Sequence, residues 1–313
     1  MRPARDTGYY AALVAATFLM GSSFIAGKRL LAGGVPALWL VGWRFLAAAA
    51  ATLPLAWLDA ARGPRRTAAA LSGRQIGTVV LIGLLQTGAV MGLLFLSMRE
   101  ISAASAAILL FTNPIWVALM ARAFLGEALF PARITGLALG IAGVALAVGP
   151  GADAGADSGH LRGELLGLAS ALCWAAATIV NKRASLPMST WTLTFWQMAI
   201  GSLALLGIAY ALGEHPATPF DARQWLWFLW LAIPASTGSF GLWFLALRRG
   251  GATRSSGYLF LAPVFTVVLS YLVLDTPVTG VQALGGTLIG AAVWLVNREA
   301  PARRRSGAPH PTG

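Results

Sequence analysis

Residues Phe111 to Leu129 read FTNPIWVALMARAFLGEAL, and the pair Asn113-Pro114 falls in the middle of the apolar run Ile101–Leu125. Pro114 has no amide hydrogen and cannot donate to the carbonyl of Leu110, so the sequence predicts a bend and an unpaired carbonyl. Within hydrocarbon an unpaired carbonyl is costly unless a cavity, water or a side chain satisfies it. The stretch therefore predicts a membrane helix that bends beside a polar space.

The composition of the whole chain is that of a membrane protein. It is 57% hydrophobic and 11% charged, whereas soluble domains are about 45–50% apolar and about 25% charged. Apolar runs long enough to cross about 30 Å of hydrocarbon recur along the chain. The ten predicted spans are Tyr9–Gly27, Pro36–Leu58, Gln75–Met98, Ile101–Leu125, Ala132–Gly149, Gly163–Val180, Thr190–Leu212, Trp225–Leu247, Ser255–Leu274 and Val278–Val296.

These runs are too long for barrel strands, and backbone polar groups inside lipid need internal partners. We therefore expect an all-α membrane protein with ten transmembrane helices. The first span ends in Gly27-Lys28-Arg29 rather than at a small-residue cleavage site, so we expect it to be retained as a helix.

The positions of the basic residues explain the formal net charge of +12. With ten spans, sixteen of the 23 Lys and Arg residues fall on the side that carries both termini and five on the other, while Arg44 and Arg122 lie within spans. The positive-inside rule then places both termini in the cytoplasm. The charge reflects topology, and we expect the lipid bilayer, rather than nucleic acid, as the partner.

The sequence offers no pattern of residues for catalysis or metal binding. Cys173 is the single cysteine, and the three histidines, His160, His215 and His310, lie outside the predicted spans. We expect no disulfide, no metal site, no cofactor and no enzymatic activity.

A Gly-, Ala- and Asp-rich segment, GPGADAGADSGH, divides the spans five and five. We expect residues 1–149 and 162–298 to form two five-helix repeats, joined by a flexible periplasmic linker at 150–161 and followed by a basic, disordered cytoplasmic tail at 299–313. SSFIAGKR aligns with ATIVNKR, WLVGWRFLA with WTLTFWQMA, and Pro114 with Pro263. One such alignment can arise by chance, but three in the same order favour a repeat. Five spans per repeat invert the second copy, as in many secondary transporters.

Paired interruptions at corresponding positions indicate a central substrate site. Pro114 and Pro263 are therefore predicted as hinges or gates, and the alternative is an ordinary kinked helix. Arg44 is a strongly basic residue well inside a span, where a substrate carboxylate or a neighbouring helix terminus would each satisfy it. The other predicted substrate-binding residues are Gln86, Asn113, Trp116, Trp174, Gln197, Ser239, Trp243 and Tyr258. For the tryptophans, packing against neighbours is the alternative.

Three stretches resemble the EamA family of the drug/metabolite transporter superfamily. They are MGSSFIAGK, FTNPIWVALMARAFLGEAL and LFLAPVFTVVLSYLVLDTPVT. The last departs from the family's usual Gly-Glu-Pro, because it carries Asp275-Thr276-Pro277. Thr276 and Pro277 predict the cap and first residue of the tenth helix.

The resemblance implies ten helices in two inverted repeats around a central cavity. It also implies movement of small metabolites such as amino acids across the bacterial inner membrane, often outward. Because no acid lies deep in a span, coupling through a buried carboxylate is not expected, whereas facilitated diffusion, exchange and coupling through the substrate's own charge are compatible with the sequence.

The rival hypotheses are a sensor or lipid-flipping protein and an intramembrane lipid-modifying enzyme. The glycine pairs Gly136/Gly140 and Gly286/Gly290 fit helix packing within a monomer or in a homodimer.

Overall fold

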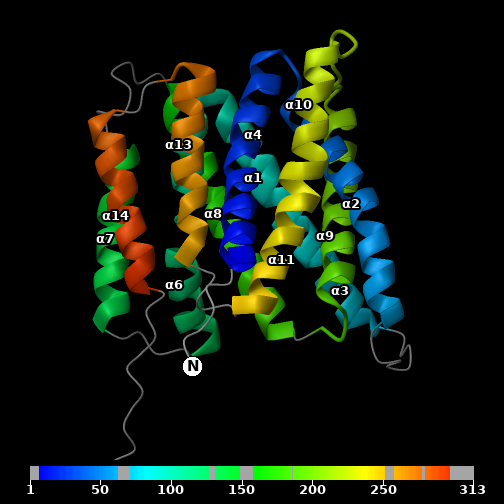
Figure 1. Cartoon of the computed structure of the whole chain (residues 1–313), viewed down its shortest axis with the longest axis horizontal. Helices are drawn as coiled ribbons and strands as arrows, with labels where there is room; N and C mark the ends of the chain where they lie inside the picture. The colour runs from blue at the N-terminus through cyan, green and yellow to red at the C-terminus, as the bar shows by residue number, and fades with distance from the viewer. Residues whose placement is uncertain are drawn as a thin grey trace, which may run out of the picture.

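The computed structural model describes residues 7–62, 71–126, 131–148, 158–184, 186–250, 257–276 and 279–296, and the regular structure in these ranges is helical. Figure 1 shows an upright bundle of helices. In chain order the elements are α1 (Thr7–Ala32), α2 (Ala37–Arg62), α3 (Gly73–Gly83), the π-helix η1 (Leu84–Ala89), α4 (Val90–Glu100), α5 (Ala103–Leu110), α6 (Asn113–Leu125), α7 (Pro131–Val148), α8 (Ser158–Ala184), α9 (Thr190–Ala211), α10 (Ala222–Ala232), the π-helix η2 (Ile233–Gly238), α11 (Ser239–Gly250), the 3₁₀-helix η3 (Gly257–Phe260), α13 (Leu261–Leu274) and α14 (Gly280–Val296).

Within the described residues, six helical segments are long and apolar enough to cross a membrane: Thr7–Ala32, Ala37–Asp59, Gly73–Glu100, Ala103–Leu125, Gly159–Ala184 and Thr190–Ala211. Shorter apolar helices cover Ile134–Gly143, Leu261–Leu274 and Ala283–Ala292. The eighth predicted span is divided among α10, η2 and α11. The protein is thus an all-helical, multi-pass membrane protein.

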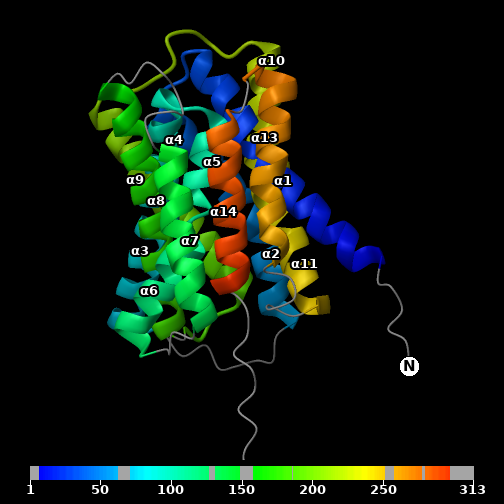
Figure 2. The same cartoon turned by 90° about the vertical axis from the view of Figure 1, so that its left-hand side faces the viewer.

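The bundle has two ends, which we name from α1. The near end carries the start of α1 and the end of α14, and the far end carries the end of α1 (Figures 1 and 2). The beginning of α8 at Ser158 includes the last four residues expected for the linker, whereas residues 150–157 and the expected tail at 299–313 lie outside the described ranges.

Local sequence explains where several helices begin. Ser72 and Gln75 form a capping box before α3, and Asp221 and Gln224 form one before α10. In each box the side chain of the first residue accepts from the backbone of the fourth, while the glutamine side chain accepts from the backbone of the first. The carboxylate of Glu214, which follows α9, accepts from two backbone amides in the first turn of α2.

The structure interrupts the fourth and ninth predicted spans at their prolines, but differently from a simple bend. Pro114 lies in the first turn of α6, directly after α5 ends and the chain turns at Phe111 and Thr112. Pro263 lies in the first turn of α13, after η3. A proline in a first turn loses no hydrogen bond that the helix could have made. Each proline therefore starts a new helix rather than kinking an existing one.

Two further interruptions have no counterpart in the sequence analysis. η1 separates α3 from α4, and η2 separates α10 from α11, so the third and eighth predicted spans each contain one π-helical turn. Such turns inside α-helices occur frequently at functional sites. Gly88 and Pro234 mark these places in the sequence, but hydropathy alone does not reveal the local change of register.

Glycines allow two close contacts in the bundle, one between α7 and α14 and one between α9 and η1. α7 packs along α14 at one edge of the bundle and α2 along α9 at the other (Figure 1). A Cβ at Gly143 would lie 2.9 Å from the carbonyl oxygen of Gly285 on α14, so this small-residue contact lies within the chain. A Cβ at Gly201 on α9 would lie 2.5 Å from the Cβ of Thr87 and 2.6 Å from the carbonyl oxygen of Gly83, so α9 rests directly on the backbone around η1.

The predicted cap of the tenth helix is wrong. Thr276 belongs to the turn that closes α13, where its backbone amide donates to the carbonyl of Ser270 at 3.3 Å. Asp275 adopts a left-handed conformation with φ of 51°, and this reverses the chain. α14 begins only at Gly280.

Substitution of Gly201 should test the close approach of α9 to η1. We expect Gly201→Ala to lower the free energy of unfolding by about 1–3 kcal/mol, because the new methyl group overlaps backbone atoms that cannot move independently. Gly207→Ala is the matched control on α9, since nothing lies within 4 Å of its Cβ position. The melting temperature in detergent, followed by scanning fluorimetry, should fall for the first variant and not for the second. Equal melting temperatures would contradict the contact.

Candidate functional site

A central cavity of about 400 Å³ lies inside the bundle. Its lining comes from both halves of the chain and includes residues of α1, α2, η1, α4, α8, α9 and η2. A volume between about 300 and 1,000 Å³ is typical of small-molecule sites. Six of the predicted substrate-binding residues line this cavity: Arg44, Gln86, Trp174, Gln197, Ser239 and Trp243.

Three predicted residues do not line it. The side-chain amide of Asn113 donates to the carbonyl of Ala171 at 3.4 Å, between α6 and α8. The indole of Trp116 donates to the hydroxyl of Thr112, four residues earlier in the chain, at 3.0 Å. Tyr258 packs against Tyr10 of α1, with ring centroids 6.0 Å apart. None of these three side chains belongs to the cavity lining.

Arg44 is the strongest polar feature of the cavity. Its side chain is 4% exposed, and Nε donates to the hydroxyl of Ser236 at 3.0 Å. The guanidinium carbon lies 4.6 Å from the ring centre of Phe45 and 5.5 Å from that of Phe95. Two aromatic rings therefore stabilise the cation from its sides, while one of its donor groups is held by η2.

The π-turn η2 fixes the partner of Arg44. The hydroxyl of Ser236 donates to the carbonyl of Leu231 at 2.8 Å, which leaves its oxygen free to accept from Arg44. The hydroxyl of the next residue, Thr237, donates to the carbonyl of Ala48 on α2 at 3.0 Å. Together these bonds tie η2 to the helix that carries Arg44.

Three amide side chains face the same space. Gln86 comes from η1, Gln197 from α9 and Asn181 from α8, and none of these amides makes a hydrogen bond within the described part of the chain. Sequence reasoning missed Asn181 as well as Ser236. Trp174, Thr178 and Asn181 follow one another at helical spacing on α8, and this periodicity was a signal that could have identified Asn181.

Two basic residues of α1 lie beyond the cavity toward the far end of the bundle. One helical turn beyond the cavity residue Phe24, the ammonium group of Lys28 donates to the carbonyls of Met98 and Ile101, at 2.5 and 2.7 Å. The neighbouring Arg29 donates to the carbonyl of Val273 at the end of α13. Lys28 and Arg29, which we call the far-end clamp, thereby join α1 to the last carbonyls of two other helices.

The near end differs, because the lining reaches the protein surface there. Asn181 is exposed and lies three residues before the end of α8. The cavity therefore extends from the buried Arg44 to the near end of the bundle.

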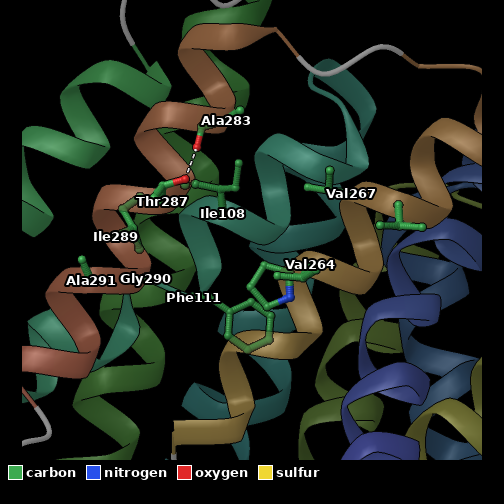
Figure 3. A pocket seen from close by; sticks show the side chains of 12 residues that line it. Ile108, Phe111, Val264, Val267, Ala283, Thr287, Ile289, Gly290 and Ala291 are labelled. Carbon is green, nitrogen blue, oxygen red and sulfur yellow. Dashed lines mark hydrogen bonds between the residues drawn. The ribbon is translucent and has the colours of Figure 1, made fainter.

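A second, apolar hollow of about 560 Å³ lies between α13 and α14, and Figure 3 shows its lining. Thr287 is the polar side chain labelled there, and its hydroxyl donates to the carbonyl of Ala283 at 2.8 Å. We call this hollow the lateral groove. Phe111 lines both the lateral groove and the central cavity. Apart from Thr287, the described residues that line the groove are apolar, so an apolar chain would fit it.

Comparison with known proteins agrees with this architecture. The chain is 26% identical over 300 residues to an uncharacterized transporter of Synechocystis, covering 91% of this chain and 88% of that one. It is 28% identical over 182 residues to the "Probable amino-acid metabolite efflux pump" of Escherichia coli, covering 54% of this chain and 59% of the pump. A crystal structure at 22% identity superposes with a TM-score of 0.61 over 91% of this chain and 96% of its own, and it shows the same fold.

The family profile also matches most of the chain. It aligns twice, to residues 7–149 and to residues 161–298. Since these two matches take in most of the sequence, the chain belongs to the EamA-like transporter family.

Proposed function

We propose that this protein is a secondary transporter of small metabolites that works by alternating access around the central cavity. The observation that carries the proposal is a cavity deep in the bundle that contains Arg44 and reaches the surface at the near end through Asn181, with the bonds of Lys28 and Arg29 beyond it at the far end. We infer that these bonds close the cavity at the far end. A cavity open to one side only is the arrangement that alternating access requires.

The moving units in this proposal are two inverted five-helix repeats, residues 1–149 and 162–298, with ten transmembrane passes. The two separate family matches support this division. The π-turns η1 and η2 occur in the third pass of each repeat, and both place residues on the cavity. The pairings of α2 with α9 and of α7 with α14 join equivalent passes, as a two-fold axis in the membrane plane would demand.

We place the protein in a bacterial inner membrane with the near end and both termini in the cytoplasm. The distribution of basic residues supports this orientation, and the relatives described above include bacterial transporters. In this orientation the structure represents a state that faces the cytoplasm. The relative named as an efflux pump supports export or exchange of metabolites such as amino acids.

The lateral groove supports one alternative, a protein that moves or senses lipids. Phe111 alone among the described residues lines both the groove and the central cavity, so an apolar chain in the groove would contact the wall of the cavity. Vesicles with fluorescent phospholipid distinguish the two functions, because a lipid-flipping protein moves the label between leaflets and a metabolite transporter does not.

Reconstituted vesicles test the transport function directly. We expect purified protein in liposomes to exchange a radiolabelled metabolite from a broad panel, and flux of none of them would contradict the proposal. We expect Pro114→Ala to change the exchange rate with little loss of stability, because alanine fits a first helical turn well. Melting temperature and exchange rate are measured on the same preparation, and a large loss of stability at unchanged rate would contradict a hinge at Pro114.

Cysteine labelling tests whether the cavity contains water. In a Cys173→Ala background, we expect Gln197→Cys to react with a small sulfonated thiol reagent at least roughly tenfold faster than Asn113→Cys, because a thiol packed away from water is inert. Both positions lie within spans, but only Gln197 lines the cavity. Labelling is followed by intact-protein mass spectrometry, and equal rates would show that the cavity is dry or misplaced.

Removal of the far-end clamp should open the opposite side. Each hydrogen bond from a charged group contributes about 1.5–3 kcal/mol, so loss of the two Lys28 bonds should shift the equilibrium toward opening by about tenfold or more. We expect Lys28→Met to raise the labelling rate of Ser23→Cys, a cavity position, by an impermeant reagent added from the far side. Arg99→Gln is the control, since Arg99 is an exposed cation close to Met98 and Ile101. An unchanged rate in Lys28→Met would contradict the clamp.

A further inference from the structure

The charge of the central cavity is unbalanced. Arg44 is the one charged side chain among the described residues that line it, and no described Asp or Glu does so. Glu164, a buried acid on the same helix as Trp174, pairs with His160 at 3.2 Å. It lies ten residues from Trp174, about 15 Å along the helix axis. The described cavity therefore holds a net positive charge.

The arginine also has free donors. Nε is taken by Ser236, but the described chain provides no hydrogen-bond partner for either Nη atom. Neither Nη atom is among the fully enclosed unpaired atoms of the described residues, which are Arg29 Nε and Ser270 Oγ. Both Nη atoms of this nearly buried side chain therefore reach the space of the cavity.

From this geometry we propose that the cavity selects an organic monoanion, a carboxylate on an aromatic or aliphatic body, over a zwitterion or cation of the same shape. The proposal rests on the transport function above and narrows its substrate class. The planar guanidinium fork matches a carboxylate with two parallel hydrogen bonds. The amides of Gln86, Gln197 and Asn181 can donate to the remaining oxygen lone pairs.

The rest of the lining suits an apolar body. Phe24, Phe111, Phe240, Trp174 and Trp243 are aromatic residues of the lining, and Trp174 stands edge-on to Phe111 with ring centroids 6.2 Å apart. Aromatic walls with a few convergent polar groups are the usual composition of small-molecule sites. They would enclose an aromatic ring or a short alkyl chain while the carboxylate meets Arg44.

An amino acid meets a difficulty in this site that a simple carboxylate does not. Its ammonium group would enter a cavity that already contains a cation, with no described carboxylate to neutralise it. Like charges in a site of low dielectric repel each other strongly.

The charge of the substrate then supplies the driving force for export. An interior-negative potential of 100 mV favours outward movement of a monoanion by a concentration ratio of about fiftyfold. No buried carboxylate is needed for this form of coupling. The direction agrees with export from the cytoplasm, the side to which the near end is assigned.

Two ligand series test the proposal, and each keeps a similar hydrocarbon body that carries a carboxylate, a carboxylate with an ammonium group, or an ammonium group alone. The first is 3-phenylpropionate, L-phenylalanine and 2-phenylethylamine, and the second is hexanoate, norleucine and pentylamine. We expect at least one of the two anions to bind the detergent-solubilised protein roughly tenfold or more tighter than its zwitterion, with the amine weakest. Binding is measured by quenching of tryptophan fluorescence, and uptake of the same compounds is measured in liposomes.

Three variants connect the selectivity to Arg44. Arg44→Gln should weaken binding of the anion by roughly thirtyfold or more, as loss of one member of a buried charge pair does. Arg44→Lys should retain the preference for the anion at lower affinity. Arg122→Gln removes an exposed arginine of α6 and should leave binding unchanged.

The possible outcomes separate the two proposals. Equal or tighter binding of the zwitterion or amine, no binding of either anion, or unchanged anion binding in Arg44→Gln overturns the selectivity. Since the ligand ranking is measured on the wild-type protein, it holds even where a variant fails to fold. Anion binding without flux of any compound overturns the transport function and leaves the selectivity standing, while preferred flux of the zwitterions does the reverse.

Discussion

A guanidinium in the interior of an apolar bundle needs compensation, and the arrangement around Arg44 supplies most of it. An unpaired charge in such a place is expensive, so the protein surrounds it with the rings of Phe45 and Phe95 and with the hydroxyl of Ser236. Among the described residues that line the cavity, no acid is present to form an ion pair with Arg44. The donors of Arg44 that lack a partner are therefore available to a ligand, whereas a fully hydrogen-bonded arginine would have none left.

The same constraint explains why the helices around the cavity are irregular. A regular α-helix pairs its own backbone groups and leaves little to define a polar site in lipid. In the π-turns the register of the backbone changes, and Gln86 and Ser236 are placed by η1 and η2. Neither turn stands alone, since α9 rests on η1 through Gly201 and η2 is bonded to α2 through Thr237. The irregular segments are thus held by the two helices that also carry Gln197 and Arg44.

Sequence reasoning found several residues of the cavity but did not predict the direction of each side chain. Hydropathy and helix-breaking residues predicted the helical membrane fold, and polar residues inside spans led to Arg44, Gln86 and Gln197. Asn113 and Tyr258 have the same polarity but face other helices, because the direction of a side chain is set by packing that apolar segments encode weakly. Hydropathy also does not predict the local register shifts at η1 and η2. Pro114 correctly indicated an interruption, whereas its form, a second helix that begins at Asn113, depends on the turn at Phe111 and Thr112.

The far-end clamp, like the cavity, holds its cations by hydrogen bonds to uncharged oxygen atoms. The last carbonyls of a helix lack partners within it, and the helix dipole makes that end attractive to a cation. Lys28 satisfies two carbonyls at and just beyond the end of α4, and Arg29 satisfies one in the last turn of α13. The charge of Glu100 also acts on Lys28, but the carboxylate of Glu100 pairs with Arg162, at 2.7 Å. In the proposed transport cycle, water can replace each cation-to-carbonyl bond on opening, so the closed and open states can remain close in free energy, as alternating access requires.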